Sequence, residues 1–155
     1  MEKVLIRKAN LEDLNAIQKL NNNLFELEFN NFDDTLKVGW PFEKEGKEYF
    51  ENMLNSEIVF VAEVEEKIVG YLAGSICEGV SYITETFAEL DNMCIDDEYR
   101  RFGIGTLLMD EFKKYCKEKN MQNIKVTASA KNSRAIQFYM KNGFEDYNVT
   151  LKYKI

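Results

Sequence analysis

The sequence predicts an α/β chain of the α+β type, in which a mixed, mostly antiparallel sheet of six or seven strands is flanked by about four helices. Two kinds of segment support this fold class. In several long segments, apolar residues recur every three or four positions, as in amphipathic helices. Shorter β-branched segments bounded by polar turns are typical of strands. Their order along the chain is β-α-α-β-β-β-α-β-α-β.

The N-terminal third is expected to hold one strand and two helices. Val4 to Lys8 alternates as a short strand, and Asn10 precedes Asp13 at nearly the spacing of a helix capping box. A helix should follow, because the leucine and isoleucine residues between Leu11 and Leu27 form one apolar stripe. Glu43 to Asn55 is predicted to be the second helix.

The middle of the chain is expected to form three strands. Ile58 to Val64 and Ile68 to Cys77 are β-branched and apolar, and the charged residues Glu65 to Lys67 between them suit a hairpin turn. Phe87 to Ile95 is the third strand of this group.

The remaining elements alternate between helix and strand. Gly103 to Asn120 has the clearest helical spacing, and Ile124 to Thr127 follows as a strand. Ser133 to Asn142 is predicted to be a helix that ends at an Asn-Gly pair. Phe144 to Ile155 is expected to supply one or two final strands.

Composition excludes several classes of function. The 155 residues fit a single domain spanning 1–155, and a net charge of −7 argues against nucleic acid, which clustered Lys and Arg would bind. A membrane partner is not expected, because no charge-free run reaches the roughly 18 residues of a membrane span. The first residues, Met1 to Val4, lack the apolar segment of a secretory signal.

The sequence also limits the chemistry. The chain contains no histidine, which removes Ser-His-Asp and Cys-His nucleophile arrangements and the commonest metal ligand. Cys77, Cys94 and Cys116 are widely spaced and form no C-x-x-C pair, so neither a disulfide framework nor a metal site is expected. A reducing, cytoplasmic location follows from these features.

The most informative segment is the glycine-containing turn from Arg100 to Gly105. It joins a predicted strand to the start of a predicted helix, where outward-facing N–H groups can bind a pyrophosphate. Leu108 occupies the place of a third glycine, so the dinucleotide fingerprint is incomplete, and no P-loop Lys-Ser/Thr follows. NAD and ATP are therefore disfavoured.

Two motifs resemble the GNAT superfamily of N-acetyltransferases. Arg100, Gly103 and Gly105 match its Arg/Gln-x-x-Gly-x-Gly/Ala loop for acetyl-CoA, and Asn132 to Tyr139 resembles its Asn-x-x-Ala-x-x-Phe-Tyr helix. The resemblance covers nearly the whole chain and implies the GNAT-like acyl-CoA N-acyltransferase fold. It also implies transfer of an acetyl group from acetyl-CoA to a primary amine in a ternary complex, with homodimers common among similar proteins.

The resemblance implies a set of donor-binding residues around the place where the strand ending at Ile95 leaves the strand starting at Ile124. Backbone groups of Met93 and Ile95 would meet the pantetheine arm, and the turn would hold the pyrophosphate. Cys94 is expected to pack as a small hydrophobe beside the site. The full implied set is Met93, Cys94, Ile95, Arg100, Arg101, Phe102, Gly103, Ile104, Gly105, Thr106, Asn132, Ala135 and Tyr139.

Catalytic roles are implied for three residues. An ammonium must lose a proton before it attacks a thioester, and Glu89 and Asp91 alternate onto one face of the strand before the turn. The sequence does not choose between these two carboxylates. Tyr139 resembles the family's tyrosine acid for the departing thiolate, although it also fits an apolar helical stripe.

The acceptor amine is not identified by any motif. In the family the acceptor is recognised by the first two helices and their connection, and a small-molecule amine and a protein amine both remain open. The residues in these elements are Phe25, Glu28, Phe32, Asp33, Asp34 and Trp40, although Trp40 and Phe42 could instead fill the core under a loop. The alternative function is an acyl-CoA sensor of the same fold, without turnover.

Overall fold

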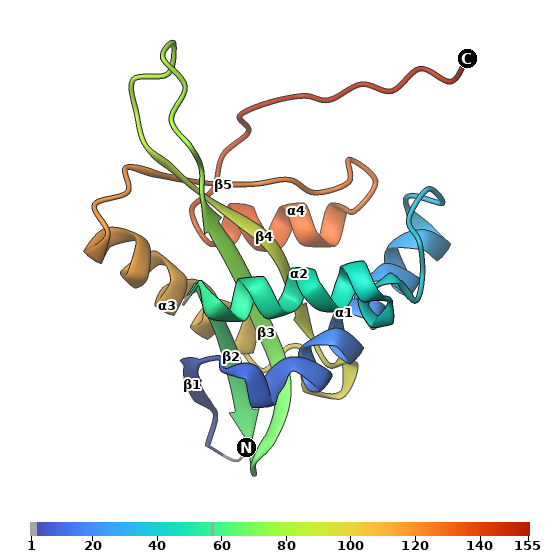
Figure 1. Cartoon of the computed structure of the whole chain (residues 1–155). Helices are drawn as coiled ribbons and strands as arrows, with labels where there is room; N and C mark the ends of the chain where they lie inside the picture. Colours follow the sequence, from blue (N-terminus) through green and yellow to red (C-terminus); the bar gives the residue numbers. More distant parts are fainter. Residues whose placement is uncertain (1–2, 57) are drawn as a thin grey trace.

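The computed structural model describes residues 3–56 and 58–155, and Figure 1 shows their arrangement. Met1 and Glu2, which belong to the expected non-secretory N-terminus, lie outside these residues. Five strands in the described ranges form one sheet in the order β1-β2-β3-β4-β5. The first four are antiparallel neighbours, and β5 is parallel to β4. Their bounds are β1 Leu5–Lys8, β2 Val59–Val64, β3 Lys67–Ile76, β4 Phe87–Ile95 and β5 Asn123–Val126.

Helices cover both faces of the sheet. Helices α1 and α2 pack on one face, and α3 packs on the other together with side chains of α4. Short 3₁₀ turns precede α1 and α2 and follow β4. The bounds are η1 Leu11–Asp13, α1 Leu14–Asn31, η2 Trp40–Phe42, α2 Lys44–Asn55, η3 Asp97–Tyr99, α3 Ile104–Glu118 and α4 Ser133–Lys141.

Each face of the sheet has its own apolar core. Val59 and Val61 of β2 pack with α1 and α2, whereas Phe60 and Ala62 pack with α3. This alternation is the period-two pattern of a strand covered on both faces. It explains why β2 and β3 are apolar at nearly every position.

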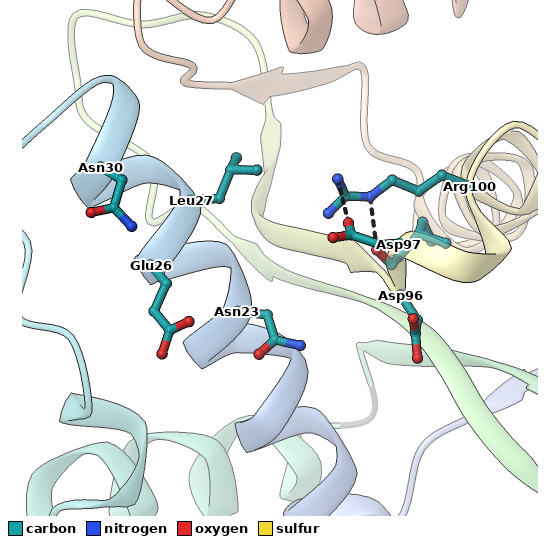
Figure 2. A pocket seen from close by; sticks show the side chains of 8 residues that line it. Asn23, Glu26, Leu27, Asn30, Asp96, Asp97 and Arg100 are labelled. Carbon is teal, nitrogen blue, oxygen red and sulfur yellow. Dashed lines mark hydrogen bonds and ion pairs between the residues drawn. The ribbon is translucent and has the colours of Figure 1, made fainter.

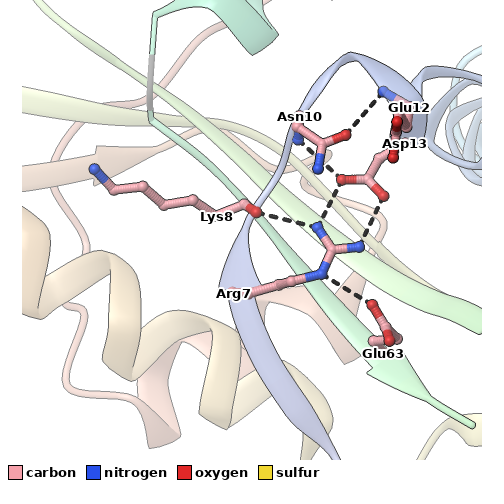
Figure 3. A network of polar contacts seen from close by, with 6 residues as sticks. All are labelled: Arg7, Lys8, Asn10, Glu12, Asp13 and Glu63. Atoms are coloured by element: carbon pink, nitrogen blue, oxygen red, sulfur yellow. Dashed lines mark hydrogen bonds and ion pairs between the residues drawn. The ribbon is translucent and has the colours of Figure 1, made fainter. Parts of the chain in front are cut away.

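Arg7 ties the first strand to the second strand and to the start of the helical segment (Figure 3). Its guanidinium donates to both carboxylate oxygens of Asp13, at 2.8 and 2.9 Å, and to Glu63 at 2.9 Å. Asp13 also accepts from the amide of Asn10, whose side chain accepts from the amide of Glu12. These contacts confirm the capping box predicted from Asn10 and Asp13.

The predicted order of elements is confirmed up to Gly143, and the prediction for the C-terminal segment, residues 144–155, is wrong. One or two strands were expected there, but the segment contains none, so the sheet of the described residues has five strands instead of six or seven. Its apolar side chains are exposed, with Leu151 and Tyr153 at 89%. Alternation alone does not make a strand, because the peptide groups and the apolar face both need a neighbour.

Gly46 lets α2 approach the turn before it. A Cβ atom at this position would lie 2.0 Å from the carbonyl oxygen of Trp40 and 2.8 Å from Cα of Pro41. Both are backbone atoms, which cannot move aside as a flexible side chain can. Glycine has a low helix propensity, but close packing against the preceding turn requires it at Gly46.

Gly46→Ala is expected to lower the free energy of unfolding by about 1–3 kcal/mol, because overpacking outweighs the gain of about 1 kcal/mol in helix propensity. Urea denaturation followed by circular dichroism measures this change. Gly79→Ala is the control, since a Cβ atom there would meet nothing within 4 Å. A raised or unchanged midpoint for Gly46→Ala would contradict this packing role.

Candidate active site

Strand β4 separates from β5 halfway along its length. The two strands pair in parallel only from Phe87 with Asn123 to Leu90 with Val126, while β4 continues to Ile95. No other strand of the described residues lies on this side of β4. An opening in the sheet therefore begins after the last paired residues, and we refer to it as the β4–β5 opening.

The peptide groups of Met93 and Ile95 face the β4–β5 opening. The amide of Asp96 donates to the carbonyl of Val69 on β3 at 2.8 Å, so it faces the paired side of the strand. Because successive peptide groups of a strand alternate in direction, those of Ile95 and Met93 face the other side. Consistent with this direction, the carbonyl of Ile95 accepts from Nε of Arg100 at 3.0 Å.

A turn with two left-handed residues leads from β4 into α3. Arg101 and Gly103 have φ angles of 71° and 79°, and α3 begins at Ile104. The first amide groups of a helix have no intrahelical partner, and the helix dipole favours an anion beside them. A Cβ atom at Gly103 would meet no atom within 4 Å, so there is space beside the turn. The turn can therefore accommodate a phosphate group.

Gly105 contributes to helix packing. A Cβ atom there would lie 3.2 Å from the ring of Phe138 on α4. The sequence interpretation assigned both glycines to the approach of a ligand. The structure adds a second reason for Gly105, because α4 packs closely against the start of α3.

A polar cavity of about 390 Å³ lies between α1 and the turn after β4. Figure 2 shows α1 side chains on one wall and Arg100 with Asp97 on the other. The guanidinium of Arg100 lies 2.6 Å from the carboxylate of Asp97, so this arginine fixes the shape of the turn. The lining residues are Asn23, Glu26, Leu27, Asn30, Ile95, Asp96, Asp97 and Arg100.

Asn132, which caps α4, contacts Glu28 of α1, and Tyr139 of α4 lies near enough for the Glu28 charge to affect it. The side chain of Asn132 accepts from the amide of Ala135 at 3.1 Å, which caps α4, and its Nδ2 donates to Glu28 at 3.5 Å. Tyr139 packs between the rings of Phe138 and Phe144. Burial, with a smaller effect of the Glu28 charge, raises the pKa of Tyr139 to about 12. Its hydroxyl therefore keeps its proton at neutral pH.

Glu28 is among the residues that the resemblance assigns to acceptor recognition, but its contact with Asn132 was not indicated by the sequence. Burial raises the pKa of its carboxyl, the hydrogen bond from Asn132 opposes that rise, and the charge of Asp33 adds to it. Because α1 covers one face of the sheet and Tyr139 packs with the core of the other, these contacts join the two layers. No local motif marks such a residue, since the contact spans 104 positions.

The two strand carboxylates lie on the face covered by α1 and α2. Asp91 has no opposite residue on β3, because Ala73 pairs with Asn92 and Gly74 with Leu90. This bulge leaves Asp91 on the same side as Glu89. Ser75, which donates to Asp91, follows Tyr71 and Ala73 at every second position of β3, and these two residues pack with α1 and α2 on one face of the sheet (Figure 1).

The surroundings of these two carboxylates differ. Asp91 accepts from the hydroxyl of Ser75 at 3.1 Å, and burial raises the pKa of its carboxyl, with the charge of Glu89 adding to the rise. Glu89 lies 3.6 Å from Nζ of Lys125 and accepts from the thiol of Cys77. Asp91 thus has no cation at contact distance among the described ion pairs, whereas Glu89 is partly neutralised.

A buried polar chain, which sequence reasoning missed, runs from α1 to the surface beside Asp91. Asn21 donates to the hydroxyl of Tyr71 at 2.9 Å, and that hydroxyl donates to Asn92 at 2.5 Å. Asn92 in turn donates to the hydroxyl of Tyr49 at 3.4 Å. The charge of Asp91 contributes to a raised pKa of Tyr49, after the larger effect of burial. Tyr49 is therefore a wall of the space in front of Asp91.

The aromatic residues proposed to surround an acceptor mostly pack on each other. Trp40 stacks on Phe25 at 6.1 Å between ring centroids and lies 5.5 Å from Tyr49. Phe42 is 53% exposed. Trp40 therefore fills the space under the loop, whereas Phe42 does not. Asp33 accepts from the amide and hydroxyl of Thr35 in a local turn.

The predicted donor-binding residues differ in exposure. Ile104 and Cys94 are buried in the two cores, so only their backbone can face a ligand. Burial raises the pKa of the Cys94 thiol to about 11, which keeps it protonated. Phe102 and Thr106 are exposed. The described residues contain no cluster of three or more His, Cys, Asp or Glu able to hold a metal ion.

The arrangement of strands, turn and helices has counterparts among known proteins. Residues 21–144 match the profile of a family described as the acetyltransferase (GNAT) family. The chain belongs to this family. An N-alpha-acetyltransferase of Sulfurisphaera tokodaii is 30% identical over 96% of this chain and 84% of its own length. An uncharacterized N-acetyltransferase of Methanocaldococcus jannaschii is 34% identical over 58% of this chain. The matched part covers only 40% of that relative's length.

A solved structure of the GNAT fold supports the assignment. It is an aminoglycoside acetyltransferase from an uncultured soil metagenomic sample, in complex with trehalose, with 26% identity and a TM-score of 0.72. The alignment covers 98% of this chain and 96% of that one. The predicted fold class and family are therefore confirmed. Acetyl transfer to an amine is the activity of the family, and acetyl-CoA is the donor that the family implies.

Within residues 3–56 and 58–155, the longest helices are too short or too polar to span a bilayer.

The pKa of Glu28 is expected to respond to its two neighbours in opposite directions. Asn132→Ser keeps a helix-capping hydroxyl but removes the donor to Glu28, so the pKa should rise. Asp33→Asn removes a nearby negative charge, so the pKa should fall. Carbon-13 NMR titration of the side-chain carboxyl measures both changes. Equal values in the two variants would contradict the contact between α1 and α4.

Proposed function

We propose that residues 1–155 form one acetyltransferase domain that moves an acetyl group from acetyl-CoA to a primary amine. The observation that carries the proposal is the β4–β5 opening, which lies between the two covered faces of the sheet. Asp91 lies on one face, and Tyr139 packs with the core of the other. The amine can therefore approach from the α1 and α2 side, and the thiol can leave on the α4 side.

The residues around the opening fit acetyl-CoA. The diphosphate would be held by backbone N–H groups from Gly103 to Thr106, with the exposed charge of Arg101 beside them. Peptide groups of Met93 and Ile95 would bind the pantetheine amides as an added strand binds a sheet edge. Asn132 and Ala135 would border the pantetheine arm at the start of α4. Bound there, acetyl-CoA supplies the activated thioester.

Asp91 is the proposed base. A typical ammonium has a pKa of about 10.4 and must lose its proton, directly or through water, before its nitrogen can form a bond to the acetyl carbon. Asp91 has a raised pKa and no close cation, which makes it a better proton acceptor than the Lys125-paired Glu89. Because Glu89 is paired with Lys125, it would contribute less than Asp91 to the attraction of a cationic acceptor.

Tyr139 is the proposed acid. As the new carbon–nitrogen bond forms, the carbon–sulfur bond breaks and the departing thiolate takes a proton. The Tyr139 hydroxyl holds its proton firmly at neutral pH, since its pKa is about 12. So high a pKa makes the phenol a weak acid, so its role would be a hydrogen bond to the departing sulfur with partial transfer of the proton. Burial, with a smaller effect of the Glu28 charge, keeps the phenol neutral.

The acceptor is proposed to be an amine that is cationic in solution. The relatives named above include an N-alpha-acetyltransferase and an aminoglycoside acetyltransferase, so peptides with free α-amino groups and amino sugars are the two classes to test. The chain is proposed to work in the cytoplasm, where its three free thiols stay reduced. No nucleic acid or membrane partner is proposed.

Release of CoA measured with a thiol reagent across such an amine panel tests the function. Release that depends on one amine class, with a mass increase of one acetyl group on that amine, supports the transferase. Calorimetric binding of acetyl-CoA without release for any amine would favour the alternative, a sensor without turnover. Absence of both binding and release would contradict both readings.

Gly103→Asp and Gly103→Asn are expected to differ in affinity for acetyl-CoA. Both side chains are tolerated in the left-handed conformation, and they differ only in charge. If the diphosphate lies beside the turn, the aspartate variant should bind at least about tenfold more weakly than the asparagine variant, a difference of roughly 1.4 kcal/mol. Isothermal titration calorimetry gives both constants. Equal affinities would place the diphosphate elsewhere.

Asp91→Asn is expected to lower kcat by about one to two orders of magnitude, within the range usual for a positioned base. Because Asp91 acts only when deprotonated, kcat/KM should fall as pH drops through its raised pKa, and that fall should vanish in the variant. Glu89→Gln is the control and should change kcat much less. Equal losses in both variants would remove the distinction between the two carboxylates.

Tyr139→Phe is expected to lower kcat about tenfold or more while the dissociation constant of acetyl-CoA changes little. The ring still packs on Phe138 and Phe144, so the thermal unfolding midpoint serves as the control for folding. Stopped assays with the amine found in the panel supply kcat. Full activity in this variant would exclude the hydroxyl as proton donor.

A further inference from the structure

Two buried side chains bring polar groups into the core between the sheet and helices α1 and α2. Tyr71 of β3 is fully buried, and Asn21 of α1 is 2% exposed. Phenylalanine and leucine would fill similar space without burying a hydroxyl and an amide. The oxygen Oδ1 of Asn21 has no hydrogen-bond partner among the described residues, which makes the arrangement more costly. Packing alone therefore does not explain these polar groups.

The hydroxyl of Tyr71 links α1 to β4. It accepts from Nδ2 of Asn21 at 2.9 Å and donates to Oδ1 of Asn92 at 2.5 Å. Burial raises the pKa of the Tyr71 hydroxyl well above its usual value, so the hydroxyl keeps the proton that it donates. Because the oxygen of Asn92 is engaged in this way, its Nδ2 is directed to the hydroxyl of Tyr49 on α2. We refer to Asn21, Tyr71 and Asn92 as the polar clamp.

The polar clamp depends on the bulge at Asp91. Leu90 and Asn92 are two positions apart on β4, and such residues share a face in a regular strand. Here Leu90 packs with the core on the α3 side, whereas Asn92 contacts Tyr71 on the α1 and α2 side. The pairing advances by two residues on β4 but by one on β3, so Asp91 is the extra residue. Regular pairing would turn the Asn92 amide toward the apolar core, away from its partner.

We propose that Tyr71 is a positioning residue for the transfer reaction, because its hydroxyl holds the bulge that places Asp91 on the acceptor side of the β4–β5 opening. This inference rests on the proposed function, in which Asp91 is the base. None of the described hydrogen bonds joins Tyr71 to Asp91, so Tyr71 acts through Asn92, the next residue on β4. Ser75 holds the carboxylate itself, at 3.1 Å, while the polar clamp holds the backbone that carries it.

The surroundings of Asp91 make its position matter for its strength as a base. Burial raises the pKa of its carboxyl, and the charge of Glu89 adds to the rise. If the bulge relaxes, the carboxyl can turn toward water, and it then becomes a weaker base. The other titratable groups that act on Asp91 or respond to its charge are Lys125 on β5, Cys77 after β3 and Tyr49 on α2. A substitution at position 71 alters none of these groups.

Carbon-13 NMR titration of the Asp91 carboxyl in the full-length chain tests the polar clamp without any need for turnover. In Tyr71→Phe the ring still fills the core, and the pKa of Asp91 should fall toward its ordinary value. Asn92→Ala, at a partly exposed position, removes the acceptor of the same hydrogen bond and should also lower this pKa. Tyr115→Phe is the matched control, because Tyr115 packs against Phe60 in the other core. It should leave the pKa of Asp91 at the wild-type value.

A double-mutant cycle on kcat tests whether Tyr71 acts through Asn92. With the amine found in the panel, Tyr71→Phe is expected to lower kcat about tenfold, without changing the dissociation constant of acetyl-CoA. The acid limb of its kcat/KM profile should move to lower pH. In the Asn92→Ala background, Tyr71→Phe should add little, because the hydrogen bond is already lost. Losses that multiply in the double variant would overturn the proposed route.

The outcomes separate the polar clamp from the proposed function. A lower pKa of Asp91 together with a lower kcat supports both. A lower pKa with unchanged kcat supports the polar clamp and contradicts Asp91 as the base. An unchanged pKa in Tyr71→Phe would overturn the inference, whether kcat falls or not. A lower thermal midpoint as the only change would assign the Tyr71 hydroxyl to stability alone, which would overturn it as well.

Discussion

The early end of pairing between β4 and β5 is the constraint on which the rest of the site depends. Only four residue pairs join these strands, so the second half of β4 has an unpaired edge in the middle of the molecule. Unpaired peptide groups require a partner. In the proposed function, the amide groups of the pantetheine arm would supply that partner, and the same opening would connect the two faces of the sheet.

The electrostatics follow from the same geometry. Helix α3 begins at the end of β4, so its positive N-terminus lies at one end of the opening. Carboxylates lie away from that turn, on β4 and α1, where burial raises the pKa of Asp91 and of Glu28. In the proposed function, this separation would direct an anionic donor to the turn and a cationic acceptor to the carboxylates.

Much of this was accessible from the sequence because it is encoded locally. The capping pair Asn10 and Asp13, the strand Phe87–Ile95 and the turn at Gly103 each depend on neighbours within a few residues, and the structure has all three. The meeting of Glu28 with Asn132, and the polar chain through Tyr71, depend on contacts distant in sequence and left no local signal. The prediction of a final strand failed for a related reason: the alternating pattern is present, but no strand of the described residues pairs with it.

The β4–β5 opening and the turn at its end are proposed to bind the donor, and a crystal structure with acetyl-CoA tests this most directly. The diphosphate oxygens are expected within hydrogen-bond distance of the amides from Gly103 to Thr106, and the pantetheine arm along Met93 and Ile95. Acetyl-CoA bound anywhere else, with this edge of β4 left without a ligand, would contradict the proposed donor site.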